Sequence, residues 1–156
     1  METPNFLDKY KKTKLKLDFP QINEIKETFK FELDEDENVL EQIRMEIFDR
    51  IFIFTEKIIE PLISDPDGLS SYIEQGMIEE EQRDRLFKLY SKIQMIKWEN
   101  NRLAIDSNER EILKWIKKTW EFWNEELKDE LTLICKTLSK SWSEIKENKD
   151  QLDYLH

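Results

Sequence analysis

Glycine is nearly missing from this chain, which has only Gly68 and Gly76 among its 156 residues. Loops that cradle dinucleotides or phosphates need several glycines close together, because the backbone must approach the ligand closely. Proline is also scarce, and the four prolines lie in turn-like or terminal positions. The sequence therefore excludes the common nucleotide-binding loops and leaves long tracts that can form uninterrupted helices.

Histidine and cysteine each occur once, as His156 and Cys135. With one histidine at the last position, the chain lacks the usual neutral-pH base, histidine-based triads, histidine zinc sites and the di-iron sites of helical bundles. Cys135 lies at the margin of an apolar helical face, so we expect a small buried hydrophobe rather than a nucleophile. We predict no catalytic residue, no cofactor and no metal, and therefore a protein that is not an enzyme.

Long hydrophobic runs are missing as well. Residues 1–16 contain no apolar run of the length that a signal peptide needs. The most apolar stretch, 47–54, is interrupted by Asp49 and Arg50 and is far too short to span a bilayer. A single cysteine also excludes an internal disulfide framework and suits a reducing compartment. We therefore expect a soluble, cytoplasmic protein without a membrane contact.

Charge is the first abundant feature. Charged residues make up 38% of the chain and give a net charge of −10, against a usual charged share of about 25%. Long helices with broad solvent faces accommodate such an excess. The acidic balance argues against the whole surface acting as a nucleic-acid or membrane footprint.

The second abundant feature is an apolar stripe in the C-terminal third, which repeats every eleven residues. Such a repeat predicts a nearly straight or slightly right-handed helical seam. A helix of this length must bury the stripe against partner helices. The pattern leaves open whether the helix is continuous. The stripe consists of Ile116, Trp120, Trp123, Leu127, Leu131, Ile134, Leu138, Trp142 and Ile145.

Apolar spacing and capping patterns predict an all-α fold. Asp106 with Glu109 forms a capping-box pattern between two long helices, which should pack antiparallel. Pro66 and Gly76 bracket a short helix, with proline at its first position and glycine past its end. The predicted architecture is an antiparallel helical bundle of three long helices (about 36–63, 79–104 and 107–147), an N-terminal helix (about 19–32) and a short connecting helix (66–75). The predicted domains are a basic, partly extended N-terminal arm (1–17), the bundle (18–147) and a frayed tail (148–156).

Aromatic residues lie outside the main stripe. Trp115, Phe122 and Leu133 recur at helical spacing and point about 100–120° away from it. Trp98 belongs to another side stripe, with Phe87 and Ile105. One reading is that the helix at 19–32 or the N-terminal arm covers the first three residues. The other is an exposed patch of Trp98, Trp115, Phe122 and Leu133 that binds another chain, most simply a second copy.

From this patch we predict a non-enzymatic assembly or adaptor protein that forms a homodimer. A second hypothesis is a nucleic-acid-binding accessory protein. It rests on lysines of the N-terminal arm, aided by others in the last helix, because clustered cations attract phosphate even on an acidic protein. The arm lysines are Lys9, Lys11, Lys12, Lys14 and Lys16, and the others are Lys114, Lys117 and Lys118.

A third hypothesis is a ligand or carboxylate-metal site inside the bundle. Arg44, Lys97, Asn100 and Asn101 are polar residues on or beside apolar helical faces, where polar groups need partners. The simpler interpretation of Asn100 is structural, because it interrupts a heptad seam and such an asparagine fixes register. Arg44 is then expected to pair with a carboxylate or to extend to the end of the bundle.

Overall fold

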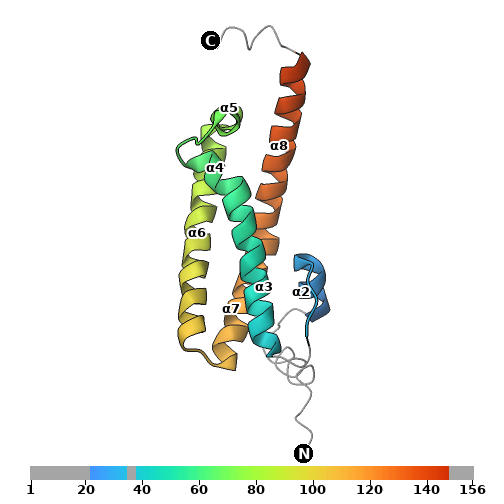
Figure 1. The fold of residues 1–156 in the computed structure, drawn as a ribbon, viewed down its shortest axis with the longest axis vertical. Helices are drawn as coiled ribbons and strands as arrows, with labels where there is room; N and C mark the ends of the chain where they lie inside the picture. Colours follow the sequence, from blue (N-terminus) through green and yellow to red (C-terminus); the bar gives the residue numbers. More distant parts are fainter. Residues whose placement is uncertain (1–21, 35–37, 148–156) are drawn as a thin grey trace, which may run out of the picture. The chain divides into compact units, whose positions relative to one another are not determined.

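The computed structural model describes residues 22–34 and 38–147. The described residues are helical and contain no strand, so the predicted all-α class is confirmed (Figure 1). The arm at 1–17 and the tail at 148–156 lie outside the described residues. Among those residues, no helix combines the length and the apolarity that crossing a membrane requires.

Most helices follow the predicted segments closely, but α2 ends at Phe29 rather than near residue 32, because Lys30 has a positive φ of 56°. The last predicted helix is one uninterrupted helical segment that includes a π-helical turn. Asn38 and Asn108 cap two helices, because their side-chain oxygens accept hydrogen bonds from the backbone N–H groups of Glu41 and Glu111. The bounds are α2 (Ile22–Phe29), α3 (Val39–Phe54), η1 (Thr55–Ile59), α4 (Glu60–Ile63), α5 (Leu69–Met77), α6 (Glu80–Ile105), α7 (Glu109–Phe122), η2 (Trp123–Leu127) and α8 (Lys128–Glu147).

Two local predictions are wrong. The short helix begins at Leu69 rather than Pro66 and continues through Gly76. The hydroxyl of Ser71, in its first turn, lies 3.1 Å from both the Asp67 carboxylate and the Gly68 carbonyl, contacts that fix the start of the helix. The predicted capping residue Asp106 is replaced by Asn108, although the connection between α6 and α7 is as short as expected.

The π-helix η1 has a cause in the sequence. Pro61 follows it and lies in the first turn of α4. A proline ring clashes with the carbonyl group four residues earlier, here that of Lys57. A wider π-helical turn, in which the Glu60 N–H donates to the Thr55 carbonyl, accommodates the ring without ending the helix.

The chain forms two compact units. Unit 1 comprises Met1–Phe52 and Met95–Phe122, and unit 2 comprises Ile53–Gln94 and Trp123–His156. Helices α3 and α6 contribute residues to both units. The prediction of one bundle domain at 18–147 stays a prediction.

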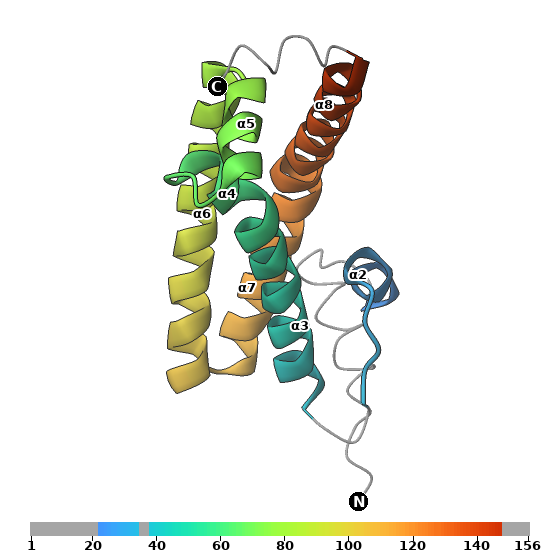
Figure 2. The same cartoon turned by 45° about the horizontal axis from the view of Figure 1, so that its top comes forward.

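In unit 1, α7 lies antiparallel beside the C-terminal part of α6 (Figures 1 and 2). The indole N–H of Trp115 donates to the Ile96 carbonyl oxygen at 3.3 Å. Ion pairs link Lys118 to Glu99 at 2.9 Å and Arg102 to Glu111 at 3.5 Å. The predicted αα-hairpin is therefore present. The core of unit 1 includes the fully buried Ile25, Ile43, Ile47, Ile51 and Ile116.

A buried arginine connects α3 with α6 in unit 1. The Arg44 guanidinium donates to the Asn100 side-chain oxygen at 2.5 Å and to the Asn100 carbonyl oxygen at 3.4 Å. It also donates to Glu41, one turn earlier on α3, at 2.5 and 3.2 Å. Each partner compensates part of the penalty for burying the arginine charge.

In unit 2, polar contacts join the first part of α6 to the helices around it. Arg85 pairs with Glu130 of α8 at 3.2 Å, and Lys92 pairs with Glu126 of η2. The Tyr90 hydroxyl lies 3.4 Å from the Glu60 carboxylate. Burial, and then the charge of Glu60, raise the pKa of the Tyr90 phenol.

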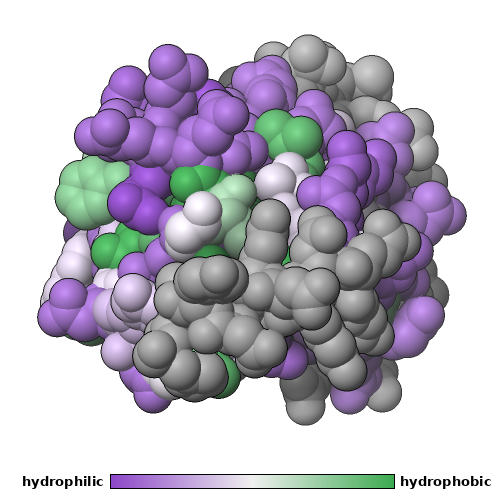
Figure 3. Space-filling view, turned by 90° about the horizontal axis from the view of Figure 1, so that it is seen from above, coloured by the Kyte–Doolittle hydropathy of each residue, from purple (hydrophilic) through white to green (hydrophobic). Residues whose placement is uncertain are grey.

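Among the residues that Figure 3 colours, most of the visible surface is hydrophilic, with a few hydrophobic side chains between polar ones. This agrees with the high share of charged residues.

The Arg44 contacts predict a specific effect of Asn100→Ala. Removing its side-chain oxygen leaves part of a buried guanidinium without an acceptor, so the free energy of unfolding falls by about 1–3 kcal/mol. The matched control Asn101→Ala, at the half-buried neighbouring position, changes it by less than about 0.5 kcal/mol. Urea denaturation followed by circular dichroism measures both variants. Equal losses would contradict the assigned role of Asn100.

Thr119 gives a second prediction. Its side chain is fully buried in α7, and its hydroxyl has no hydrogen-bond partner in the described part of the chain. Thr119→Val removes this hydroxyl at nearly the same volume and raises the free energy of unfolding by about 1 kcal/mol. Thr132→Val, at an exposed position, serves as the control in the same thermal and urea measurements. A loss of stability in Thr119→Val would show that the hydroxyl has a partner.

Candidate functional site

The four residues predicted to form one interface are not equally accessible. Trp115 is 3% exposed and Phe122 is also buried, whereas Trp98 is 66% exposed and Leu133 is exposed. The exposed patch is therefore wrong for Trp115 and Phe122. The Trp115 indole N–H donates a hydrogen bond to the Ile96 carbonyl oxygen of α6.

Exposed and half-buried aromatic side chains meet on the outside of unit 1, where α3 and α6 contribute to one surface. The Lys97 ammonium group lies 5.6 Å from the ring centroid of Phe52 and 5.6 Å from that of Trp98. The Phe48 and Phe52 rings stack at 5.3 Å. Seven residues after Trp98, on the same face of α6, Ile105 is 86% exposed. We call Phe48, Phe52, Lys97, Trp98 and Ile105 the Trp98 surface.

This arrangement orients the exposed tryptophan. A cation near two aromatic faces is attracted to both rings, which restricts Trp98 before any partner binds. A pre-oriented aromatic side chain loses less conformational entropy on binding than a mobile one. The Trp98 surface is therefore suited to contact another macromolecule.

The predicted buried polar residues have roles within unit 1. Arg44 and Asn100 are buried and bond to each other, Lys97 lies over aromatic rings, and Asn101 is half-buried. The pairing of Arg44 with Asn100 needs no ligand. Within the described ranges, no group of three or more His, Cys, Asp or Glu residues could hold a metal ion.

The predicted nucleic-acid arm, Lys9–Lys16, lies outside the described residues. Two of the lysines expected to aid it face carboxylates: Lys117 lies 3.8 Å from Glu121, and Lys118 lies 2.9 Å from Glu99. Lys114 is exposed. The paired lysines offer phosphate less attraction than free cations would.

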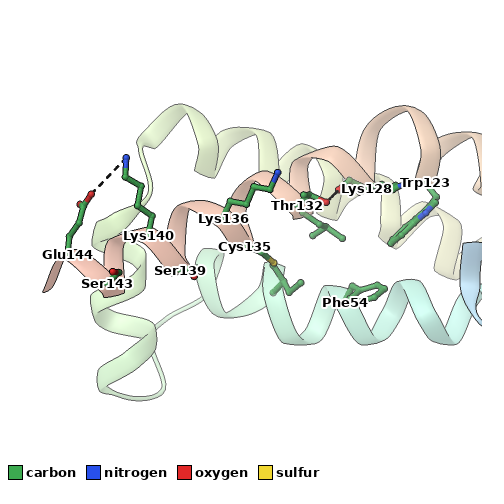
Figure 4. Close-up of a pocket in the computed structure, with 12 residues that line it drawn as sticks. Phe54, Trp123, Lys128, Thr132, Cys135, Lys136, Ser139, Lys140, Ser143 and Glu144 are labelled. Atoms are coloured by element: carbon green, nitrogen blue, oxygen red, sulfur yellow. Dashed lines mark hydrogen bonds and ion pairs between the residues drawn. The ribbon is translucent and has the colours of Figure 1, made fainter. Parts of the chain in front are cut away.

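Unit 2 contains an open groove that sequence analysis did not predict. Its cavity volume is about 990 Å³, and Phe54 and Ile58 form one wall. Trp123, Leu131 and Cys135 belong to the facing helical segment (Figure 4). The Phe54 and Trp123 rings stack at 5.6 Å. We call this cavity the α8 groove, because most of its lining belongs to α8.

Cys135 corrects a prediction, because it is exposed rather than buried. Figure 4 shows its side chain pointing from α8 toward the helix that carries Phe54. The sequence held a weak signal of this opening. Thr132, Cys135, Ser139 and Ser143 recur along one face of α8, where a core-facing helix would carry large apolar residues.

Comparison with known proteins finds no match. No family model matches the chain, and no curated protein or solved structure is significantly similar to it.

Burial separates the two tryptophans of the α6–α7 hairpin, and this gives a third prediction. Trp115→Ala opens a cavity in unit 1 and lowers the free energy of unfolding by about 3–5 kcal/mol. Trp98→Ala, which removes an exposed ring, lowers it by no more than about 1 kcal/mol. Urea denaturation of both variants measures the difference. Similar losses would mean that Trp98 is a core residue, contrary to its exposure.

Proposed function

We propose that this protein is a non-enzymatic α-helical assembly protein that binds a second copy of itself through the Trp98 surface. The observation that carries the proposal is the 66% exposure of Trp98 beside Lys97 and Phe52. Tryptophan is enriched among the few residues that dominate binding energy. An exposed cluster of large apolar side chains marks an interaction surface more often than a chance feature.

A second copy is the simplest partner for this surface. Lys97 is a cation next to Trp98 in sequence, and a carboxylate of the second copy can approach it at short range. A two-fold dimer also places the same surface on both sides, so that each Trp98 meets the partner's apolar side chains. We place this assembly in the cytoplasm, a proposal supported by the single cysteine of the chain.

Self-association predicts a change in mass when the surface is made acidic. The double variant Trp98→Glu/Ile105→Glu introduces two like charges per copy into the apolar contact. The dissociation constant of the dimer rises by at least about 30-fold, as expected when a residue worth 2 kcal/mol or more is lost. Light scattering coupled to size-exclusion chromatography measures the mass over a dilution series.

Leu69→Glu/Tyr72→Glu is the matched control, because both residues are exposed and lie in α5 of unit 2. This control changes charge and apolar area similarly and keeps the dimer. Circular dichroism verifies that both variants remain folded. A wild-type monomer at about 100 μM, a concentration at which a dimer with a dissociation constant of about 1 μM is almost fully formed, would refute the proposal. Equal weakening by both double variants would refute the assignment to the Trp98 surface.

A further inference from the structure

The α8 groove combines an apolar lining with a series of cations. The apolar lining comes from Phe54 and Ile58 on one wall and from Trp123 and Leu131 on the facing helical segment. The exposed face of α8 that lines the groove carries small residues, namely Thr132, Cys135, Ser139 and Ser143. Small side chains allow another backbone to approach α8 closely. The groove is therefore shaped for an elongated, partly apolar occupant.

Lys128, Lys136 and Lys140 line this groove, together with one carboxylate, Glu144, among the described lining residues. The lining thus carries three positive charges and one negative charge, on a protein whose net charge is −10. Lys140 and Glu144 are 3.9 Å apart and both exposed, so solvent screens their attraction. Lys136 and Lys140 extend away from Phe54, at the rim (Figure 4). The groove is locally complementary to negative charge.

The spacing of the lysines decides between occupants. From Lys128 to Lys140 the axis of α8 rises by about 18 Å. A ligand with a single anionic head group would use the cations at only one end. A helix with carboxylates at successive turns meets them along the entire groove. An open groove of this kind also matches the known mode in which an amphipathic helix lays its apolar face between two helices.

We propose that the α8 groove binds an amphipathic α-helix of a partner protein, whose apolar stripe is flanked by aspartate or glutamate residues. The stripe contacts Phe54, Ile58, Trp123 and Leu131, and the flanking carboxylates pair with the lysine rim. The site lies within unit 2 and shares no residue with the Trp98 surface of unit 1. Self-association and helix binding can therefore fail independently.

Cys135 supplies a reporter, because it is the only cysteine of the chain, is exposed and lines the groove. The probe is a synthetic peptide of about 18 residues, or five helical turns, with a leucine stripe flanked by glutamates. Bound peptide slows alkylation of Cys135 by iodoacetamide, and fluorescence anisotropy of the labelled peptide gives its affinity. Three control probes are the peptide with lysines in place of glutamates, the glutamate peptide with a central proline, and dodecanoate.

The protein variant Lys128→Glu/Lys136→Glu/Lys140→Glu weakens binding of the glutamate peptide by at least about tenfold, because attraction becomes repulsion at three rim positions. Lys57→Glu/Lys88→Glu/Lys114→Glu is matched in charge and changes exposed lysines outside the groove. It keeps most of the affinity. Circular dichroism verifies the fold of both variants.

Protection of Cys135 by the glutamate peptide alone, lost in the groove variant, supports the proposal. Absence of binding up to about 1 mM, the weakest affinity of interest, overturns it. Equal binding of the lysine peptide overturns the charge complementarity. Protection by dodecanoate without the glutamate peptide assigns the groove to a single-headed anionic amphiphile, and equal binding of the proline peptide excludes a helix. None of these outcomes depends on the oligomeric state.

Discussion

The buried guanidinium of Arg44 is the constraint on which the arrangement of unit 1 depends. Removing a charge from water carries a penalty of several kcal/mol unless partners compensate it. Glu41 supplies the opposite charge from the same helix, but the contacts with Asn100 cross to α6. Because Asn100 offers both its side-chain and backbone oxygens, α3 and α6 satisfy this charge in one register. If only apolar side chains joined α3 and α6, the two helices could shift along each other more easily.

That register also determines where the exposed aromatic side chains lie. Phe52 follows Arg44 by about two turns on α3, and Lys97 precedes Asn100 by nearly one turn on α6. Fixing Arg44 against Asn100 therefore brings Phe52 to Lys97, whose ammonium group also faces Trp98. The polar contact inside unit 1 thus shapes the surface outside it. Helix α6 accepts the hydrogen bond of the buried Trp115 at its Ile96 carbonyl oxygen and carries the exposed Trp98 two residues later.

Local patterns predicted most of the helices because helical spacing and caps depend on neighbours in sequence. In the sequence, Asn100 and Arg44 interrupt apolar helical faces, and both are buried. Exposure was harder to predict, because the phase of a helix gives the direction of a side chain but not the helix that covers it. Trp115 and Cys135 illustrate this: the hypothesis of an exposed patch is wrong for Trp115, and the expected burial is wrong for Cys135. The α8 groove depends on residues 54 and 58 meeting residues 123–144, a pairing that no local pattern encodes.

The electrostatics of the α8 groove explain how a strongly acidic protein can attract an acidic partner. At a distance, a net charge of −10 repels carboxylates. At physiological ionic strength this repulsion is screened beyond about 8 Å, whereas contacts between the lysine rim and a docked helix act over shorter distances. Burial of the apolar stripe adds an attraction that depends little on charge. Binding therefore requires both an apolar stripe and flanking carboxylates in one partner. An acidic chain without the stripe lacks the apolar attraction, and a basic helix is repelled by the lysines of the rim.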